Sequence, residues 1–192
     1  LKPFSSIEIL DLGLEVKPQL NYFKIHDFAI NPSVRIDDGA QINAMEIFQK
    51  GLEFGTNYES SDDYVILAES VPSGTTTANA SAKALGYKCD AYFSSSFKDV
   101  PNDIKNSTIN EALKRVQKDD DVFAKLSKVS DNMLIFNAGF ILGSTSKNLK
   151  VILAGGTQMA TVLLIVNSIL ESMQGEIDSS NIALCTTKWI NE

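Results

Sequence analysis

The sequence predicts an α/β fold with a mainly parallel sheet, helices on both faces and a Rossmann-like layout. Three observations predict it. Short apolar runs alternate with amphipathic stretches along the chain, as in strand–helix repeats. Two runs, Tyr64–Ala68 and Lys150–Ala154, are almost wholly apolar, which is typical of parallel strands covered on both faces. Each of them leads directly into a polar, glycine-containing loop and then a helix, as at the carboxyl edge of a parallel sheet.

The first part of the chain predicts one strand and one helix before the first apolar run. Ser6–Leu12 alternates apolar and polar residues, which predicts a strand, and a turn follows through Pro18. Asn21–Gly39 has no regular period, so we expect an irregular connection there. Ala44–Phe54 has apolar residues at helical spacing, and Gly55 is expected to end this helix.

The rest of the chain predicts five helices and a last strand. A small-residue helix is expected from the first glycine loop to about Leu85, followed by a polar connection over Lys98–Lys105. Ile182–Cys185 predicts the last strand. Neither a repeat nor a linker divides the chain, so residues 1–192 are expected to form a single α/β domain. The remaining helices are expected over Ser107–Lys118, Val122–Val129, Asn132–Leu142 and Met159–Met173.

Composition and charge exclude several classes of protein. The net charge of −7 argues against a nucleic-acid platform, which needs a basic surface. No apolar run approaches the length of a membrane span. Two cysteines and the single His26 offer neither a disulfide framework nor a metal centre, so no metal is expected and the location is expected to be cytoplasmic. Because Arg35 and Arg115 are the only arginines, a bound phosphate must rely on lysine, hydroxyl and backbone N–H groups.

The two loops that follow the apolar strands could hold an anion. They are Ser70–Thr77 and Gly155–Thr157, at the same edge of the predicted sheet. First-turn N–H groups and the hydroxyls of Thr75 and Thr76 could bind a phosphate, and Gly74 would permit close backbone approach and a positive φ. The ending of a P-loop is absent. The alternative is an ordinary helix N-cap beside a glycine turn, and the pattern favours neither.

Single polar residues are weaker signals. Glu69 ends an apolar strand and could accept from a ribose hydroxyl, act as a base, or be an exposed strand-end charge. Lys105, considered alone, is interpreted as a surface lysine just before a helix. Cys89 is not expected to be a nucleophile, and His26 is expected to pack or cap within its loop. Asp119–Asp121 is interpreted as solvated charge at a helix start rather than a metal site.

Six segments, in order along the chain, carry a resemblance to a known family. They are Ile9–Val16, Ala44–Gly55, Glu69–Ala80, Lys105–Leu113, Val129–Ser144 and Val151–Ala160. In them the chain resembles the nicotinate-nucleotide–dimethylbenzimidazole phosphoribosyltransferases of cobalamin nucleotide-loop assembly, most of all their archaeal branch. The loop that starts at Glu69 and the helix that carries Lys105 are fairly specific in combination, whereas each alone is weak.

The resemblance implies a nucleotide- and phosphoribosyl-binding domain without a cofactor. Its expected activity is transfer of phosphoribosyl from nicotinate mononucleotide to an aromatic base, such as dimethylbenzimidazole, in cobalamin lower-ligand synthesis. Glu69 resembles the acidic residue of the nucleotide loop, and Lys105 resembles the lysine that reaches the phosphate. Ala154 stands where the family often has an aspartate that contacts ribose, and Ser130–Asn132 departs from the bacterial Gly-Gly-Phe-Glu pattern. The two phosphate loops would comprise Ser73, Gly74, Thr75 and Thr76, and Gly155, Gly156 and Thr157.

Two parts of the family are expected outside the chain. A region that contributes to the base pocket should precede Leu1, and a Glu-Gly-x-Gly-Ala motif with the general-base glutamate should follow Glu192. The chain is therefore expected to be an incomplete, inactive part of a longer enzyme, with no catalytic residue of its own. A homodimer is an assembly that the resemblance allows. The alternatives are a non-catalytic nucleotide- or phosphate-binding module and another sugar-phosphate enzyme.

Overall fold

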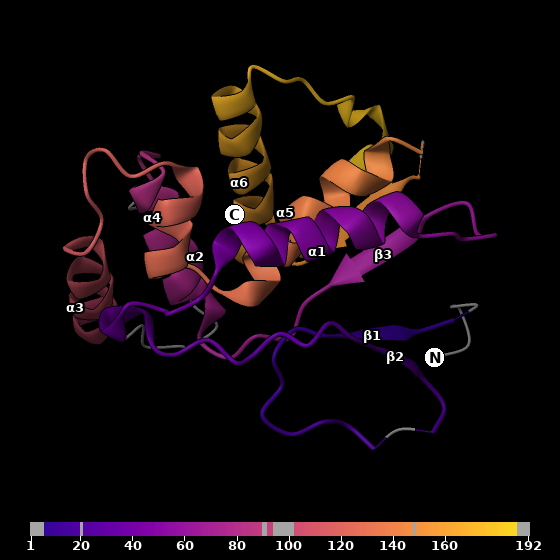
Figure 1. Cartoon of the computed structure of the whole chain (residues 1–192), viewed down its shortest axis with the longest axis horizontal. Coiled ribbons are helices and arrows are strands. Elements are labelled where there is room, and N and C mark those ends of the chain that lie inside the picture. The colour runs from indigo at the N-terminus through magenta and orange to yellow at the C-terminus, as the bar shows by residue number, and fades with distance from the viewer. Residues whose placement is uncertain (1–5, 20, 90–91, 94–101, 148, 188–192) are drawn as a thin grey trace.

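The computed structural model describes residues 6–19, 21–89, 92–93, 102–147 and 149–187 (Figure 1). Two short 3-10 helices, Ile36–Asp38 and Ser179–Asn181, complete the regular elements of this part. The strands are β1 (Glu8–Asp11), β2 (Lys24–Asp27), β3 (Val65–Ala68), β4 (Val151–Ala154) and β5 (Ile182–Cys185). The α-helices are α1 (Ala44–Asn57), α2 (Gly74–Ala84), α3 (Asn102–Leu113), α4 (Val122–Val129), α5 (Asn132–Thr145) and α6 (Thr157–Met173).

All strand pairs in the described residues are parallel, which confirms the predicted α/β class. β1 pairs with β2, and a separate sheet has the order β3-β4-β5. Ala68, Ala154 and Cys185 pair at the carboxyl ends of these three strands. The loops after β3 and β4 therefore leave the same edge of one sheet, as predicted.

The core is centred on α5, which packs closely on α1. Phe136 and Phe140 of α5 are almost completely buried, as expected of a helix that is apolar on nearly all sides. A Cβ at Gly55 would overlap the carbonyl of Phe140, and one at Gly51 would overlap that of Phe136. The prediction that Gly55 ends α1 is therefore wrong: this glycine lets two helices approach, and α1 continues to Asn57.

The strand β2 lies within Asn21–Gly39, which the sequence predicted to be irregular. Its residues, Lys24–Asp27, begin and end with charged side chains and show no clear apolar alternation. They are extended because they pair in register with β1. A strand whose formation depends on a partner, rather than on its own pattern, is not visible in the local sequence.

The helix α3 is displaced from the predicted Ser107–Lys118. It spans Asn102–Leu113, so Lys105 lies inside the helix, and the predicted connection Lys98–Lys105 is wrong over its described residues 102–105; residues 98–101 lie outside the described residues. After Leu113 the backbone continues in turn bonds, from the Arg115 N–H to Ala112 and from the Val116 N–H to Leu113, both at 3.1 Å, so the α-helix does not reach Lys118.

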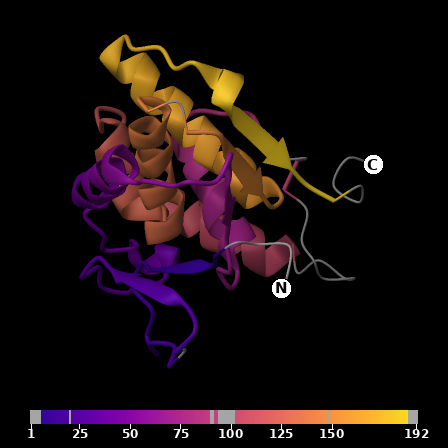
Figure 2. The ribbon, with the colours of Figure 1, turned by 90° about the vertical axis from the view of Figure 1, so that its right-hand side faces the viewer.

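One face of the three-stranded sheet packs on the core. Leu67, Val151 and Leu153 are buried within it. On the opposite face Ile66 is 39% exposed, so the expectation that the strand at Tyr64–Ala68 is covered on both faces is wrong for that face. Figure 2 shows α6 to one side of β5. None of the helices in the described ranges is long and apolar enough to cross a membrane.

Candidate functional site

A hydrogen bond joins the ends of β3 and β4 at the carboxyl edge of the sheet. The Gln158 Nε2 atom, in the first turn of α6, donates to Glu69 Oε1 at 2.8 Å. The other Glu69 oxygen accepts from the Val71 N–H at 2.8 Å. Glu69 is therefore not a free strand-end charge. It joins the first loop to the second, so the two predicted loops lie side by side at this edge.

At position 74 there is no space for a side chain, because the Gln158 side chain lies against Gly74. A Cβ at Gly74 would overlap Gln158 Oε1. The expectation of a positive φ at Gly74 is wrong, because the left-handed residue of this loop is Ser73, with φ of 60°. Sequence reasoning missed Gln158 altogether, since a lone glutamine in a helix has no motif around it.

The helices at this edge begin without a side-chain cap. Neither Ser73, before α2, nor Gly156, before α6, caps its helix through a side chain. In contrast, the side chains of Asn43, Asp121 and Asp131 cap α1, α4 and α5. Of the two alternatives for the first loop, the ordinary N-cap is therefore wrong as far as the Ser73 side chain is concerned.

The unused N–H groups are concentrated at α6. Within the described residues, the N–H groups of Thr157 and Gln158 have no hydrogen-bond acceptor. At α2 the N–H of Gly74 bonds to Val71 and that of Thr76 to Ser73, which leaves those of Thr75 and Thr77, against three at α6 when Met159 is included. Free N–H groups at a helix start carry partial positive charge and suit an anion. The second loop therefore offers the more open anion site.

A buried carboxyl group reaches the same edge from α5. Asp131 is 7% exposed, and its Oδ1 accepts from the Leu134 N–H at 2.9 Å. Its Oδ2 is buried and has no hydrogen-bond partner in the part of the chain described. Burial raises the pKa of Asp131 to about 6, and the nearby charge of Glu69 acts in the same direction. In the sequence, Asp131 was noted only because Ser130–Asn132 differs from the bacterial family pattern. It was not predicted to be a site residue.

Asn132, the next residue, ties this edge to the N-terminal strands. Its Nδ2 donates to the carbonyls of Leu12 at 2.8 Å and Asn31 at 2.9 Å. These carbonyls follow β1 and β2, so the carboxyl ends of these two strands lie near the start of α5. The same asparagine therefore fixes the position of Asp131 relative to the N-terminal loops.

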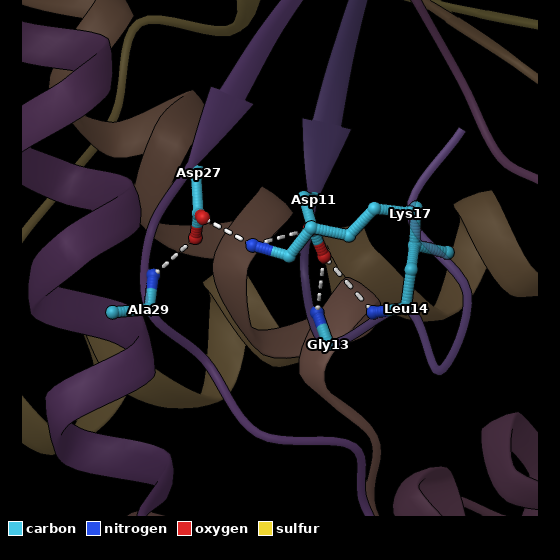
Figure 3. A network of polar contacts seen from close by, with 6 residues as sticks. All are labelled: Asp11, Gly13, Leu14, Lys17, Asp27 and Ala29. Carbon is cyan, nitrogen blue, oxygen red and sulfur yellow. Dashed lines mark hydrogen bonds and ion pairs between the residues drawn. The ribbon is translucent and has the colours of Figure 1, made fainter. Parts of the chain in front are cut away.

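Lys17 bridges the carboxyl ends of β1 and β2 (Figure 3). Its ammonium bonds to Asp27 and lies 3.6 Å from Asp11 Oδ2. Asp11 also accepts from the N–H groups of Gly13 at 3.1 Å and Leu14 at 2.9 Å. The hydrogen bond from Lys17 holds the pKa of Asp27 below its ordinary value. We interpret this network as a clamp that shapes the loops, because its cation is already paired with two carboxylates.

Lys105 is buried but is not in contact with the first loop. It is 8% exposed, and its ammonium donates to the Phe93 carbonyl at 3.1 Å. In the described residues no hydrogen bond or ion pair joins it to Gly74–Thr76 or to a carboxylate. Burial lowers the pKa of Lys105. The interpretation as a surface lysine is therefore wrong, and its predicted contact with a phosphate stays a prediction.

Comparison with known proteins gives a fold. No family model matches the chain. Similar proteins include a UPF0284 protein of Methanocaldococcus jannaschii, 34% identical over 99% of this chain and 53% of its own length. A UPF0284 protein of Aeropyrum pernix is 32% identical over 94% of this chain and 50% of its own length. The chain thus spans about half the length of the curated relatives that it matches.

Solved structures from Thermus thermophilus are similar along nearly the whole chain. One is a nicotinate-nucleotide–dimethylbenzimidazole phosphoribosyltransferase, with a TM-score of 0.68 and 16% identity over 92% of this chain and 52% of that one. Another, CobT, has a TM-score of 0.69 and 16% identity over 92% of this chain and 54% of that one. The chain shares their fold.

The candidate site presents hydrogen-bond donors on one side and carboxyl oxygens on the other. The start of α6 presents N–H donors, whereas Glu69 and Asp131 present carboxyl oxygens. A phosphate suits the donors, and hydroxyl or N–H groups suit the acceptors. No group of three or more His, Cys, Asp or Glu side chains in the described ranges is placed to hold a metal ion.

Proposed function

We propose that this chain is part of a cytoplasmic enzyme that transfers phosphoribosyl from nicotinate mononucleotide to an aromatic base such as dimethylbenzimidazole, in cobalamin lower-ligand synthesis. The observation that carries the proposal is the uncapped start of α6 beside the Glu69–Gln158 bond, at one edge of a parallel sheet. This edge is where α/β folds hold phosphorylated ligands. The shared fold with the Thermus enzyme supports it.

Each loop then has a role in holding the nucleotide. The N–H groups of Thr157 and Gln158 would bind the 5′-phosphate, with the hydroxyls of Thr75 and Thr76 beside them. Glu69 would accept a hydrogen bond from a ribose hydroxyl. Gly155 and Gly156 lack side chains, which leaves room for the phosphate, and the Gly155 N–H is used in a bond to Cys185 at 3.0 Å.

The buried Lys105 is the cation proposed for this phosphate. An ammonium that is buried without a carboxylate partner among the described residues is costly unless an anion compensates it. Release of its bond to the Phe93 carbonyl would free the ammonium for the ligand. The protein has a net charge of −7, so an anionic nucleotide needs such a local cation.

In the reaction, the bond between C1′ of the ribose and the pyridine nitrogen breaks and a bond from C1′ to the base nitrogen forms. Nicotinate leaves, and the acceptor base loses a proton to a carboxylate. The general base is expected in the part of the enzyme outside this chain. The residues of the chain hold the phosphate and ribose so that C1′ is fixed for attack.

Calorimetric titration of the 192-residue chain tests the binding half of the proposal. Nicotinate mononucleotide is compared with nicotinate riboside, which lacks only the phosphate. A charge-assisted phosphate site contributes about 1.5–3 kcal/mol, so the mononucleotide should bind roughly ten- to a hundredfold more tightly. Equal affinity for the two ligands would contradict a phosphate site.

Catalysis needs a second measurement, because the chain spans about half of its relatives. Nicotinate release is followed with a panel of aromatic bases, using this chain joined to the segments of the M. jannaschii protein that lie outside the matched region. Turnover supports the transferase. Tight mononucleotide binding without turnover favours a non-catalytic nucleotide-binding module, and preference for another sugar phosphate favours a different enzyme.

A further inference from the structure

Glu69 and Asp131 lie at the carboxyl edge of the three-stranded sheet without a positively charged partner. Glu69 accepts from the Gln158 amide and the Val71 N–H. Asp131 accepts through Oδ1 from the Leu134 N–H. In the part of the chain that the structure describes, neither carboxyl group forms an ion pair. The charge of Glu69 nevertheless acts on Asp131, so the two groups lie close enough to repel each other.

Neutral oxygen atoms at this edge are also short of hydrogen-bond donors. Ser130 Oγ, Asn132 Oδ1 and Gln158 Oε1 are buried, and none of them has a partner among the described residues. Two of these residues flank Asp131 in the chain, and the third is bonded to Glu69. Buried polar atoms are nearly always paired in folded proteins. Together with the two carboxyl groups, these oxygens favour a positively charged group at this edge.

The elements packed around Asp131 supply no charge to balance it. Within the described ranges, Glu69 is the only charged group that shifts the pKa of Asp131. The start of α6 has no charged side chain. The charged groups of the neighbouring loops, of α4 and of α1 act on one another: Asp11 and Asp27 bind Lys17, Lys125 and Lys128 act on Asp120, and Glu46 pairs with Lys50.

We propose that Asp131 and Glu69 stabilise positive charge on the ribosyl group of the donor nucleotide. The inference rests on the proposed function and concerns the reacting carbon of the same site. When the glycosidic bond breaks, its electron pair stays with the pyridine nitrogen and positive charge passes to C1′ and O4′. A lone pair of the base nitrogen then forms the new bond, and the N–H proton of the base goes to the general base.

The burial of Asp131 decides how it acts. Its Oδ2 atom is covered, so the carboxylate acts through its electric field rather than by contact with the ligand. A fixed charge in a site that excludes water stabilises developing charge more strongly than the same charge in water. Glu69 is the carboxyl group proposed to touch the ribose, and Asp131 adds to the field around it. The free N–H groups of α6 bind the phosphate at the other side of the ligand.

A matched pair of ligands isolates the ribosyl charge. Iminoribitol 5-phosphate has an ammonium group in place of the ring oxygen, whereas anhydroribitol 5-phosphate keeps that oxygen and shares the phosphate and the hydroxyls. In calorimetric titration of the 192-residue chain at pH 7, the ammonium compound should bind roughly tenfold or more tightly. This preference should shrink as the pH falls through about 6, where Asp131 takes up a proton while the amine stays charged.

Asp131→Asn separates the charge from the fold. The amide keeps a capping oxygen for α5, so the variant should fold, which circular dichroism checks. It should bind anhydroribitol 5-phosphate as the wild type does and lose roughly three- to tenfold in affinity for the ammonium compound. Its preference should no longer change between about pH 5 and pH 7. Asp121→Asn is the control, because Asp121 caps α4 in the same way but is exposed, and it should behave as the wild type.

The outcomes separate this inference from the proposed function. Equal affinity of the wild type for the two ligands would overturn the inference and leave the phosphate site standing. An undiminished preference in Asp131→Asn, with the pH dependence of the wild type, would also overturn it. If that variant does not fold, the pH series of the wild type decides, since a preference that is constant from about pH 5 to pH 7 excludes Asp131. Failure of both ligands to bind would contradict the phosphate site itself, and this inference with it.

Discussion

Gln158 and Glu69 lie 89 positions apart in the sequence and meet in a hydrogen bond of 2.8 Å at the end of two parallel strands. The contact is possible because Gly74 has no side chain where the glutamine amide lies. Three elements, β3, α2 and α6, are fixed relative to one another by these three residues. The shape of the proposed nucleotide site therefore depends on a hydrogen bond that no local sequence motif predicts.

Substitution of Gly74 tests this relationship. In Gly74→Ala the new Cβ would displace the Gln158 amide, leave Glu69 with one partner fewer, and cost about 1–3 kcal/mol in the free energy of unfolding. Urea denaturation measures that loss. In a Gln158→Ala background the same glycine substitution should cost clearly less, because the clash is gone. Fully additive losses in the double variant would contradict the coupling.

Asp131 predicts a specific dependence of stability on pH. Its folded-state pKa of about 6 lies above that of an unfolded aspartate, so the folded protein binds the proton more tightly. This contribution is favourable below about pH 4 and is lost as the pH rises to about 6, at a cost of roughly 3 kcal/mol. Asp131→Asn keeps a capping oxygen for α5 and removes the titration. The free energy of unfolding of Asp131→Asn minus that of the wild type should therefore be more positive at pH 7 than at pH 4.

The control for Asp131 is another capping aspartate. Asp121 caps α4 through its side chain in the same way, with a bond of 2.7 Å from the Ala124 N–H, but it is exposed. The urea midpoint of Asp121→Asn, compared with that of the wild type at pH 4 and at pH 7, should show no gain for the variant at the higher pH. The same pH dependence in Asp131→Asn and the wild type would show that the carboxyl ionises normally.

The sequence predicts the elements whose own residues encode them and misses those that depend on distant partners. Val151–Ala154 is apolar throughout and forms the central strand as expected. Lys24–Asp27 is extended only because β1 lies beside it. Gly55 has the local signature of a helix end, but its neighbour across the core is the Phe140 backbone, which no local window contains.

The candidate site divides in the same way. The loops and Glu69 could be predicted, because strand, polar glycine loop and helix follow each other directly in the chain. Gln158 and Asp131 could not, because their roles arise from contacts across the sheet edge and from burial. The side chain of Lys105 was misjudged because a lysine in a polar segment gives no sign of being covered.

The glycines between α1 and α5 predict a graded stability effect. A Cβ at Gly139 would overlap the Phe48 carbonyl, so Gly139→Ala should force the helices apart and cost about 1–3 kcal/mol or more. Gly86→Ala is the matched control: φ is 95° there, but no atom lies within 4 Å of the added Cβ. It should lose only about 1 kcal/mol, from left-handed backbone strain. Equal urea midpoints for the two variants would argue against close helix packing.

The last prediction concerns the phosphate and separates a ligand contact from a structural one. In Lys105→Ala, affinity for nicotinate mononucleotide should fall by about 1.5–3 kcal/mol, as expected for loss of a charge-assisted hydrogen bond. Dimethylbenzimidazole has no phosphate. Its affinity should therefore change little when it is measured with the chain joined to the segments that complete the base pocket. Lys114→Ala is the control, because Lys114 follows the same helix, is exposed and pairs with Glu111, so both affinities should be kept. Calorimetric titration decides among the outcomes. Equal losses for the two ligands would mean that the buried ammonium supports the fold through Phe93, and unchanged affinities would remove Lys105 from the site.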